Sequence, residues 1–314
     1  MKWEMAAPRD RYAETLISLA KEGRDMVVLD ADLSSSTRTA RFGKEFPDRF
    51  FNSGIAEQNM MGVAAGMATT GKLVFASTFA VFATGRAYDQ IRQSIAYPHL
   101  NVKIVATHAG ITVGEDGASH QMIEEIALMN ALPGMTVISP VDIYETEKAV
   151  RAVADMNGPA YIRLSRSAMP VVTDESTPFS IGKALKLIDG SDVTIMATGI
   201  MVSRAIEAAE MLKERGISAS VVNISTIKPI DRALVVSEAK RTGAVVTAEE
   251  HNILGGLGSV IASVLSEEYP VPLRMVGIRD VFGESGSPTE LLKKYGLTAE
   301  NIVRAAEELL RIKR

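Results

Sequence analysis

Short apolar runs without alternation recur along the chain, and most are followed by a longer segment with apolar residues at helical spacing. Continuous apolar runs of this kind are typical of strands covered on both faces, and their repetition with helices indicates a parallel sheet. The pattern therefore predicts an α/β fold with two consecutive domains, each a mostly parallel sheet with helices on both faces.

In the first half, the pattern predicts strands at residues 26–29, 73–76, 102–106, 135–138 and 160–164, and a short β-type run at 49–52. The helices predicted between them span residues 11–21, 79–95, 122–131 and 143–156. In the second half, strands are predicted at 184–188, 193–197, 219–223, 244–248 and 273–276, and helices at 202–214, 232–241, 256–266, 289–294 and 299–312.

The segment 167–179 has two prolines, several hydroxyl residues and no periodicity, which is typical of a linker. We predict a first domain at residues 1–170, a linker at 171–181 and a smaller second domain at 182–314.

One acidic residue, Glu57, lies within the mainly small and apolar segment FNSGIAEQNMMGVAAG (51–66). Met60, Met61 and Ala64 recur at helical spacing, so Glu57 is expected in the first turn of a helix that is apolar on most sides. An ionised carboxylate is costly there unless it is paired or hydrogen-bonded. Glu57 is then either an acid favoured by the helix dipole, or a buried acid of raised pKa that shares a proton with a ligand nitrogen.

The loops that carry Asp32, Ser36, Thr78, His108 and Arg166 all leave the carboxyl ends of predicted strands. In parallel sheets, ligands bind at this edge. We therefore expect these loops to form one site.

The loop THAGITVGEDGASHQ (107–121) contains His108, Asp116, His120 and three glycines. It either closes over a small polar substrate or is a glycine-rich surface connection. A metal site is disfavoured, because this spacing matches no compact ligand motif.

Phe79 and Phe82 lie three residues apart beyond a predicted strand. Such aromatic residues usually belong to a core, although a flat heteroaromatic ring could bind between them. Arginines at 9 and 11, and at 163 and 166, could bind a phosphate through paired hydrogen bonds, or be solvated charges.

Composition excludes several classes of protein. The net charge is −4, which does not favour non-specific nucleic-acid binding, and no cysteine is present for a disulfide or a thiolate metal site. No signal peptide or membrane-length apolar run is seen, so we expect a soluble cytoplasmic protein without nucleic-acid or membrane partners. No phosphate-binding P-loop or nucleophile elbow occurs either.

Six segments resemble, in order, the C-terminal half of transketolases: ADLSSST (31–37), GIAEQNMMG (54–62), FASTFAVF (75–82), THAGITVGEDGASHQ (107–121), LPGMTVISPVD (132–142) and LSRSAMP (164–170). The resemblance identifies the first domain as pyrimidine-binding and the second as the transketolase C-terminal domain. It implies thiamine diphosphate as cofactor and a split enzyme. A separate N-terminal subunit with a Gly-Asp-Gly motif would bind the diphosphate and Mg²⁺ (or Ca²⁺), and two copies of each chain would assemble.

The resemblance also assigns roles to residues. Glu57 would bind N1′ of the aminopyrimidine and promote cofactor activation, and Phe79 and Phe82 would enclose that ring, with Gly85 where a third aromatic is frequent. Asp116 and His120 would bind the hydroxyl and carbonyl groups of the sugar near the reacting carbons, His120 with a catalytic role. The residues expected around the sugar phosphate are Ser36, His108, Arg166 and Arg9, with Arg11 as the alternative to Arg9.

The implied reaction moves a two-carbon ketol unit from a ketose phosphate to an aldose phosphate. The alternatives are a 2-oxoacid dehydrogenase β-type subunit, a deoxyxylulose phosphate synthase-like subunit and a non-catalytic scaffold subunit. The GEDG loop and the phosphate-site candidates favour a sugar enzyme over the first of these.

Overall fold

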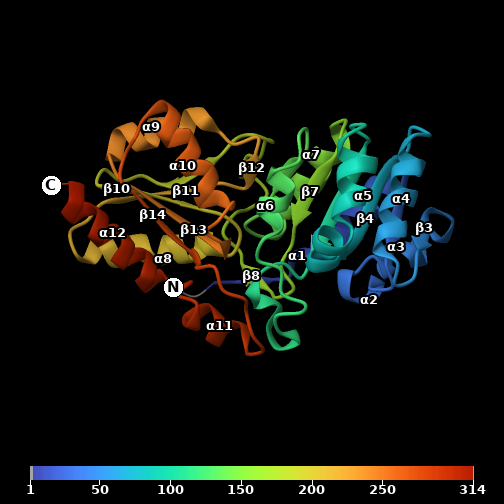
Figure 1. Ribbon diagram of the computed structural model, residues 1–314, viewed down its shortest axis with the longest axis horizontal. Coiled ribbons are helices and arrows are strands. Elements are labelled where there is room, and N and C mark those ends of the chain that lie inside the picture. Colours follow the sequence, from blue (N-terminus) through green and yellow to red (C-terminus); the bar gives the residue numbers. More distant parts are fainter. Residues whose placement is uncertain (1–2, 314) are drawn as a thin grey trace.

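The computed structural model describes residues 3–313 and contains two α/β domains that lie side by side along the long axis of the molecule (Figure 1). Each is a mostly parallel sheet between helices, so the predicted fold class is confirmed. The predicted linker, 171–181, carries no helix or strand, and we keep it as our proposed division between the domains.

The sheet of the first domain has seven strands, all parallel except β12 at one edge. In spatial order they are β12 (Thr226–Lys228), β6 (Thr136–Ile138), β7 (Ala160–Arg163), β5 (Val102–Thr107), β4 (Leu73–Phe79), β2 (Met26–Asp30) and β3 (Phe50–Asn52). The helical segments of this domain are α1 (Pro8–Lys21), α2 (Ser34–Thr37), α3 (Ala40–Glu45), η1 (Pro47–Arg49), α4 (Glu57–Ala68), η2 (Val81–Arg86), α5 (Tyr88–Gln90), η3 (Ile91–Ala96), η4 (Ile111–Asp116), α6 (Glu125–Asn130) and α7 (Ile143–Asp155).

Successive residues of each central strand face opposite sides of the sheet. In β2, Val27 and Leu29 pack into the layer that contains α4 and α6, whereas Met26 and Val28 pack into the layer of α1 and α7. Because both faces are covered, the strand has no polar side and its apolar run does not alternate.

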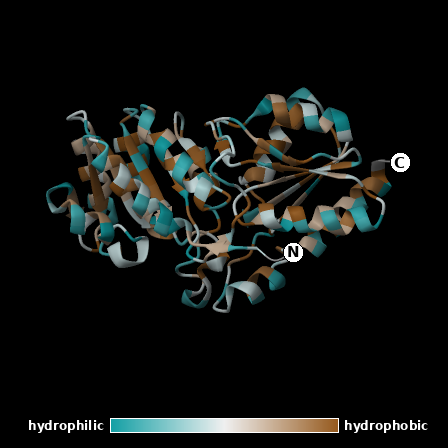
Figure 2. Ribbon diagram, turned by 180° about the vertical axis from the view of Figure 1, so that it is seen from behind, coloured by the Kyte–Doolittle hydropathy of each residue, from teal (hydrophilic) through white to brown (hydrophobic). Residues whose placement is uncertain are grey.

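The second domain has a five-stranded sheet in which only β9 is antiparallel. In spatial order its strands are β14 (Leu273–Ile278), β13 (Val245–Asn252), β10 (Val193–Ala197), β11 (Ala219–Asn223) and β9 (Leu185–Ile188). Its helices are α8 (Met201–Glu214), α9 (Arg232–Thr242), α10 (Leu257–Glu268), α11 (Pro288–Lys294) and α12 (Ala299–Lys313). Helices α8 and α12 cover one face of the sheet, and α9 and α10 cover the other. The hydropathy colouring shows hydrophobic residues concentrated on the inner surfaces of both domains (Figure 2).

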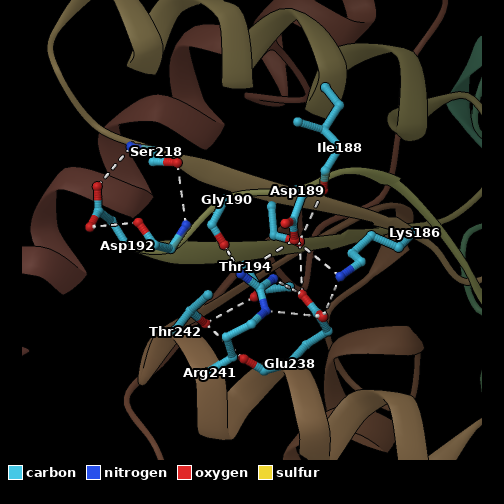
Figure 3. Close-up of polar contacts among 12 residues, drawn as sticks. Lys186, Ile188, Asp189, Gly190, Asp192, Thr194, Ser218, Glu238, Arg241 and Thr242 are labelled. Carbon is cyan, nitrogen blue, oxygen red and sulfur yellow. Dashed lines mark hydrogen bonds and ion pairs between the residues drawn. The ribbon is translucent and has the colours of Figure 1, made fainter.

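Polar contacts fix the turn between β9 and β10 to helix α9 (Figure 3). Glu238 of α9 accepts a hydrogen bond from the Ser220 hydroxyl at 2.8 Å and forms ion pairs with Arg241 and with Lys186, the latter at 3.4 Å. Arg241 also donates to the carbonyl of Gly190. This cluster stabilises the second domain and lies outside the candidate site.

The prediction of one continuous helix over 79–95 is wrong. Phe79 is the last residue of β4, and two π-helical turns, η2 and η3, flank the single α-helical turn α5. The fully buried residues Ala83, Ala87, Ile91 and Ile95 are spaced by four, a period wider than the 3.6 of an α-helix. Over so short a stretch the two periods are difficult to distinguish in a sequence.

The short elements were also missed by the sequence pattern. Strand β8 (Met169–Pro170) pairs with β1 (Met5–Ala6), and β12, which lies between β11 and α9 in the chain, joins the sheet of the first domain next to β6. Segments of two or three residues carry no periodicity, so only the tertiary structure defines them. None of the helices within residues 3–313 is both long and apolar enough to cross a membrane.

A buried acid, Glu145, connects the two domains. Its carboxylate accepts hydrogen bonds from the Val141 amide at 2.7 Å and from the Asn223 side chain of β11 at 2.9 Å. Asp142, the N-cap residue of α7, accepts a hydrogen bond from the Glu145 amide at 3.0 Å. Burial raises the pKa of Glu145 to about 7 against these hydrogen bonds, and the charge of Asp142 adds to the increase.

This raised pKa predicts a pH-dependent stability. The folded protein holds a proton on Glu145 that the unfolded chain releases at lower pH, so this contribution is complete below about pH 4.5 and is lost as pH rises through about 7. The free energy of unfolding of Glu145→Gln should therefore rise by about 3 kcal/mol relative to that of the parent protein as pH increases from 5 to 8. Urea unfolding at several pH values measures the difference, and parallel curves for the two proteins would contradict it.

Candidate active site

The carboxyl ends of β2, β4, β5 and β7 lie next to one another in the sheet, and the predicted site residues gather at this edge. The structure brings Glu57, Phe79, Phe82, His108 and His120 into one group of contacts. It brings Arg9, Ser36 and Arg166 close to His108 in a second, cationic group.

Glu57 is the first residue of α4 and is only 2% exposed, as the sequence led us to expect. Its two carboxylate oxygens each accept a hydrogen bond of 3.0 Å from one terminal nitrogen of Arg86. The Arg86 side chain is 48% exposed, so the buried acid is paired with a cation that reaches solvent. The position of Glu57 at the N-terminus of α4 also favours the negative charge of its carboxylate.

Helix α4 is less apolar around its circumference than predicted. Met60, Met61 and Ala64 are buried, whereas Gln58, Gly62 and Val63 are exposed. Together with Phe51 and the 79% exposed Ile55, Val63 gives this side of the domain several exposed apolar side chains. A helix with one buried and one small-residue exposed face suits contact with another chain.

Aromatic rings form a stack beside Glu57. The Phe79 and Phe82 ring centres are 5.8 Å apart and nearly parallel, and the His108 ring lies 3.6 Å from that of Phe79. The Arg86 guanidinium lies 4.5 Å from the Phe82 ring centre. A flat ring inserted between two others needs about 7 Å, twice the van der Waals contact distance, so Phe79 and Phe82 leave no room between them in this conformation.

His108 has a left-handed backbone, with φ of +59°, which is uncommon for a residue other than glycine. Its Nδ1 lies 2.9 Å from the Thr107 hydroxyl. Burial lowers the pKa of His108 to about 3, and the charges of Arg9, Arg166 and His120 act in the same direction. The ring is therefore neutral at physiological pH and binds ligands only by hydrogen bonds or stacking.

Arg9 supplies an unsatisfied positive charge at the same edge. One terminal nitrogen donates to the Ser36 carbonyl at 2.9 Å, while its Nε is buried and has no hydrogen-bond partner among the described residues. Burial and the nearby charges of Arg38 and Arg166 lower the pKa of Arg9, although Asp10 opposes them. Arg38 and Arg166 have carboxylate partners of their own in Asp10 and Glu115, so a bound anion would relieve above all the repulsion that they exert on Arg9.

Arg11, the alternative to Arg9, belongs to a different surface. Its guanidinium pairs with Glu147 at 2.8 Å and lies over the Tyr144 ring. Arg163, another candidate from the sequence, is buried between the domains and pairs with Glu125 and Glu250. The geometry therefore favours Arg9 and Arg166 for an anionic ligand.

Asp30 orders the turn that carries Ser36, and sequence reasoning missed this role. Its buried carboxylate accepts hydrogen bonds from the Leu33 amide at 2.7 Å and from the hydroxyls of Thr37 and Thr39 at 2.7 and 2.8 Å. Burial raises the pKa of Asp30 against these bonds. The signal was an acid at the end of an apolar strand, directly before a run of Ser and Thr.

The loop between β5 and α6 carries Asp116 and His120. The His120 ring meets Phe82 edge-on at 5.5 Å between centres, and its Nδ1 lies 3.0 Å from the Ser119 hydroxyl. Asp116 is exposed near the tip of the loop. Arg166 donates to the Val113 carbonyl and pairs with Glu115 at 3.2 Å, so it also contacts this loop.

The chemistry of the first group suits a ligand with a flat ring and a basic or protonated nitrogen, because a buried carboxylate lies among aromatic side chains. The second group suits an anion. No cluster of three metal-ligating side chains occurs in the described part of the chain.

Comparison with known proteins agrees with this architecture. Residues 4–172 match the family model described as "Transketolase, pyrimidine binding domain", and residues 182–302 match "Transketolase, C-terminal domain". The chain therefore belongs to the transketolase family, which is thiamine diphosphate-dependent.

Two relatives and one solved structure illustrate the similarity. The chain is 55% identical over 303 residues to the "Putative transketolase C-terminal section" of Methanocaldococcus jannaschii, which covers 96% of this chain and 95% of that protein. It is 46% identical over 301 residues to a 6-deoxy-6-sulfo-D-fructose transketolase subunit of a Clostridium species, covering 96% and 94% of the two chains. A structure described as "Split gene transketolase, inactive beta4 tetramer" superposes with a TM-score of 0.92 at 56% identity, covering 98% and 99%.

The pair of Glu57 and Arg86 gives a testable prediction for the chain by itself. Arg86→Met leaves a buried carboxylate without its charged partner, so we expect a loss of about 2 kcal/mol in the free energy of unfolding at neutral pH. In a Glu57→Gln background the same change should cost less than half as much, because no buried charge then needs a partner. Urea unfolding of the four proteins measures this coupling, and equal costs in both backgrounds would contradict it.

Proposed function

We propose that this chain is the C-terminal subunit of a split transketolase that transfers a two-carbon ketol unit from a ketose phosphate to an aldose phosphate. The observation that carries the proposal is the buried carboxylate of Glu57, which Arg86 links to Phe82 at the sheet edge where Arg9 and Arg166 also lie, next to the neutral ring of His108. A flat cofactor ring and an anionic sugar would then bind next to each other.

Thiamine diphosphate, when bound, supplies the nucleophilic carbon that accepts the two-carbon unit. Glu57 would hold a proton shared with N1′ of its aminopyrimidine, and Phe79 and Phe82 would contact that ring. In this structure both carboxylate oxygens of Glu57 accept from Arg86, so Arg86 has to release at least one of them for this contact to form. The exposure of Arg86 makes that displacement feasible, since its guanidinium can be solvated elsewhere.

For the sugar, we assign the terminal anionic group to Arg9, Arg166, Ser36 and His108. The unpartnered Nε of Arg9 supports this assignment, because a buried cationic donor gains most from an anionic acceptor. Asp116 and His120 would bind the hydroxyl and carbonyl groups near the reacting carbons, and His120 would also take part in catalysis. The relative from Clostridium is named for a sulfonated sugar, so a sulfonate is a second terminal group to test.

The diphosphate and its Mg²⁺ (or Ca²⁺) are assigned to a separate N-terminal subunit with a Gly-Asp-Gly motif. The names of two relatives, a transketolase C-terminal section and a transketolase subunit, support a split enzyme. The exposed side of α4 and the exposed Ile55 and Phe51 offer surface for chain–chain contacts. We propose an assembly with two copies of each chain.

A two-carbon transfer assay tests the proposal. Xylulose 5-phosphate and ribose 5-phosphate are supplied with thiamine diphosphate and Mg²⁺, to this chain by itself and to its mixture with a candidate Gly-Asp-Gly subunit. We expect activity only in the mixture, and a decrease of about 100-fold or more for Glu57→Gln, whose amide cannot share the proton. Unchanged turnover of the Glu57→Gln complex would indicate a non-catalytic subunit.

Additional arms of the assay separate the alternatives. A pyruvate donor tests the 2-oxoacid dehydrogenase β-type and deoxyxylulose phosphate synthase-like alternatives, and 6-deoxy-6-sulfofructose tests the sulfonate. Activity of this chain without a partner would overturn the assignment of the diphosphate site to another subunit.

Arg9 and Arg11 provide a matched pair of variants on one helix. Arg9→Met should raise the KM for the phosphorylated donor by about 10- to 100-fold, because charge-assisted hydrogen bonds to the phosphate are lost. Arg11→Met, which removes the ion pairs with Glu147 and Glu14 and the contact with the Tyr144 ring, should change KM by less than about threefold. The reverse ranking in steady-state kinetics would assign the phosphate to Arg11, and an unphosphorylated ketose donor serves as the control for charge recognition.

A further inference from the structure

The loop between β5 and α6 is held in part by the second domain. The Gln121 amide donates to the carbonyls of Ile111 and Gly114, both at 3.2 Å, and also to the carbonyl of Glu284 at 2.9 Å. The loop backbone lies close to the segment before α11, since a Cβ on Gly117 would meet the Ser285 hydroxyl at 2.5 Å. Substitution there is also opposed by the φ of +73° at Gly117.

Glu250, on β13 of the second domain, holds the start of the same loop. Its carboxylate is almost fully buried, and Oε1 accepts a hydrogen bond of 2.7 Å from the amide of Thr112. The backbone of Gly110 lies directly against this carboxyl group, because a Cβ on Gly110 would be 2.2 Å from the Glu250 Cδ. Glycine at position 110 is therefore required by the close approach of Glu250.

The charge of Glu250 is balanced by Arg163, at the end of β7. One terminal nitrogen of Arg163 lies 3.6 Å from Oε2 of the Glu250 carboxylate. The other donates a hydrogen bond of 2.7 Å to the backbone carbonyl of Glu250. Arg163 is held in turn by Glu125, in α6 just beyond the loop. Arg163, at the end of β7 in the first domain, thus holds Glu250 in place, and Glu250 in turn holds the loop between β5 and α6.

We propose that Glu250 is a positioning residue, which anchors the loop through the Thr112 amide and thereby sets the place of Asp116 and His120 for the sugar donor. This inference rests on the proposed function, and it gives the second domain a role in the site although none of its residues was predicted to be part of it. The tip of the loop has hydrogen bonds of its own, from the Gly117 amide to the Gly114 carbonyl and from the His120 and Gln121 amides to the Gly117 carbonyl. The placement of the loop against the rest of the protein depends on the contacts of Thr112 and Gln121 with the second domain and of Arg166 with Val113 in the first.

Hydrogen exchange of the complete chain, by itself and in complex with the N-terminal subunit, tests the anchor. Glu250→Met preserves side-chain length but removes the acceptor for the Thr112 amide. We expect the amides of residues 111–117 to exchange about tenfold faster or more, with little change in the strands of either sheet. In the complex, we expect the KM for the ketose donor to rise about tenfold with unchanged affinity for thiamine diphosphate.

Two further variants separate the anchor from the loss of a buried ion pair. Glu250→Gln removes the same charge from Arg163 but retains an acceptor oxygen, so the loop should stay protected. Glu125→Gln weakens the other partner of Arg163 without touching Thr112, so it should lower global stability without selective exchange in the loop.

Uniformly faster exchange in Glu250→Met, or loop exchange equal to that of the parent, would overturn the proposal. An unchanged donor KM in an active Glu250→Met complex would also overturn it. If the parent complex transfers no two-carbon unit, the proposed function fails, and the exchange of the loop still decides whether Glu250 anchors it.

Discussion

The arrangement of the two domains depends on the buried guanidinium of Arg163. A charge in such a place is stable only with close opposite charges and hydrogen bonds, and it finds them in Glu125 of α6 and Glu250 of β13. One of these partners lies beyond the loop of the candidate site, and the other lies in the second domain. The ion pairs of Arg163 therefore connect the end of β7 with the helix that follows the loop and with the sheet of the second domain.

The other essential constraint is the burial of Glu57. Its carboxylate has to be satisfied in every state of the protein, and in the chain by itself Arg86 fulfils this need from the solvent side. A buried acid with an exposed, displaceable partner can exchange that partner for a ligand nitrogen without leaving a charge unpaired. The rings of Phe79 and Phe82 likewise satisfy each other, since they stack with their centres 5.8 Å apart.

The two groups of the site differ in how they are built. The acidic and aromatic group depends on one helix start and on the π-helical segment that follows β4, which brings Phe82 and Arg86 to the same side. The cationic group is assembled from α1, from the turn ordered by Asp30 and from the loops after β5 and β7. Residues far apart in the sequence meet there because parallel strands place their carboxyl ends at one edge.

The sequence by itself determined the fold class and most of the longer elements, and it supplied the candidate residues that the structure gathers at one sheet edge. Uninterrupted apolar runs, helical spacing and the segments around Glu57 and His120 are local properties, and they persist in the folded chain. The tertiary structure decided what depends on contacts between distant segments. It showed that Arg9 rather than Arg11 belongs to the cationic group. It also showed that Arg163 is a buried charge between the domains and that Arg86 pairs with Glu57. It also replaced the helix predicted from Phe79 with π-helical turns, because a spacing of four residues differs too little from 3.6 to be recognised in one chain. Partners of buried charges are chosen by proximity in space, which the order of residues does not specify.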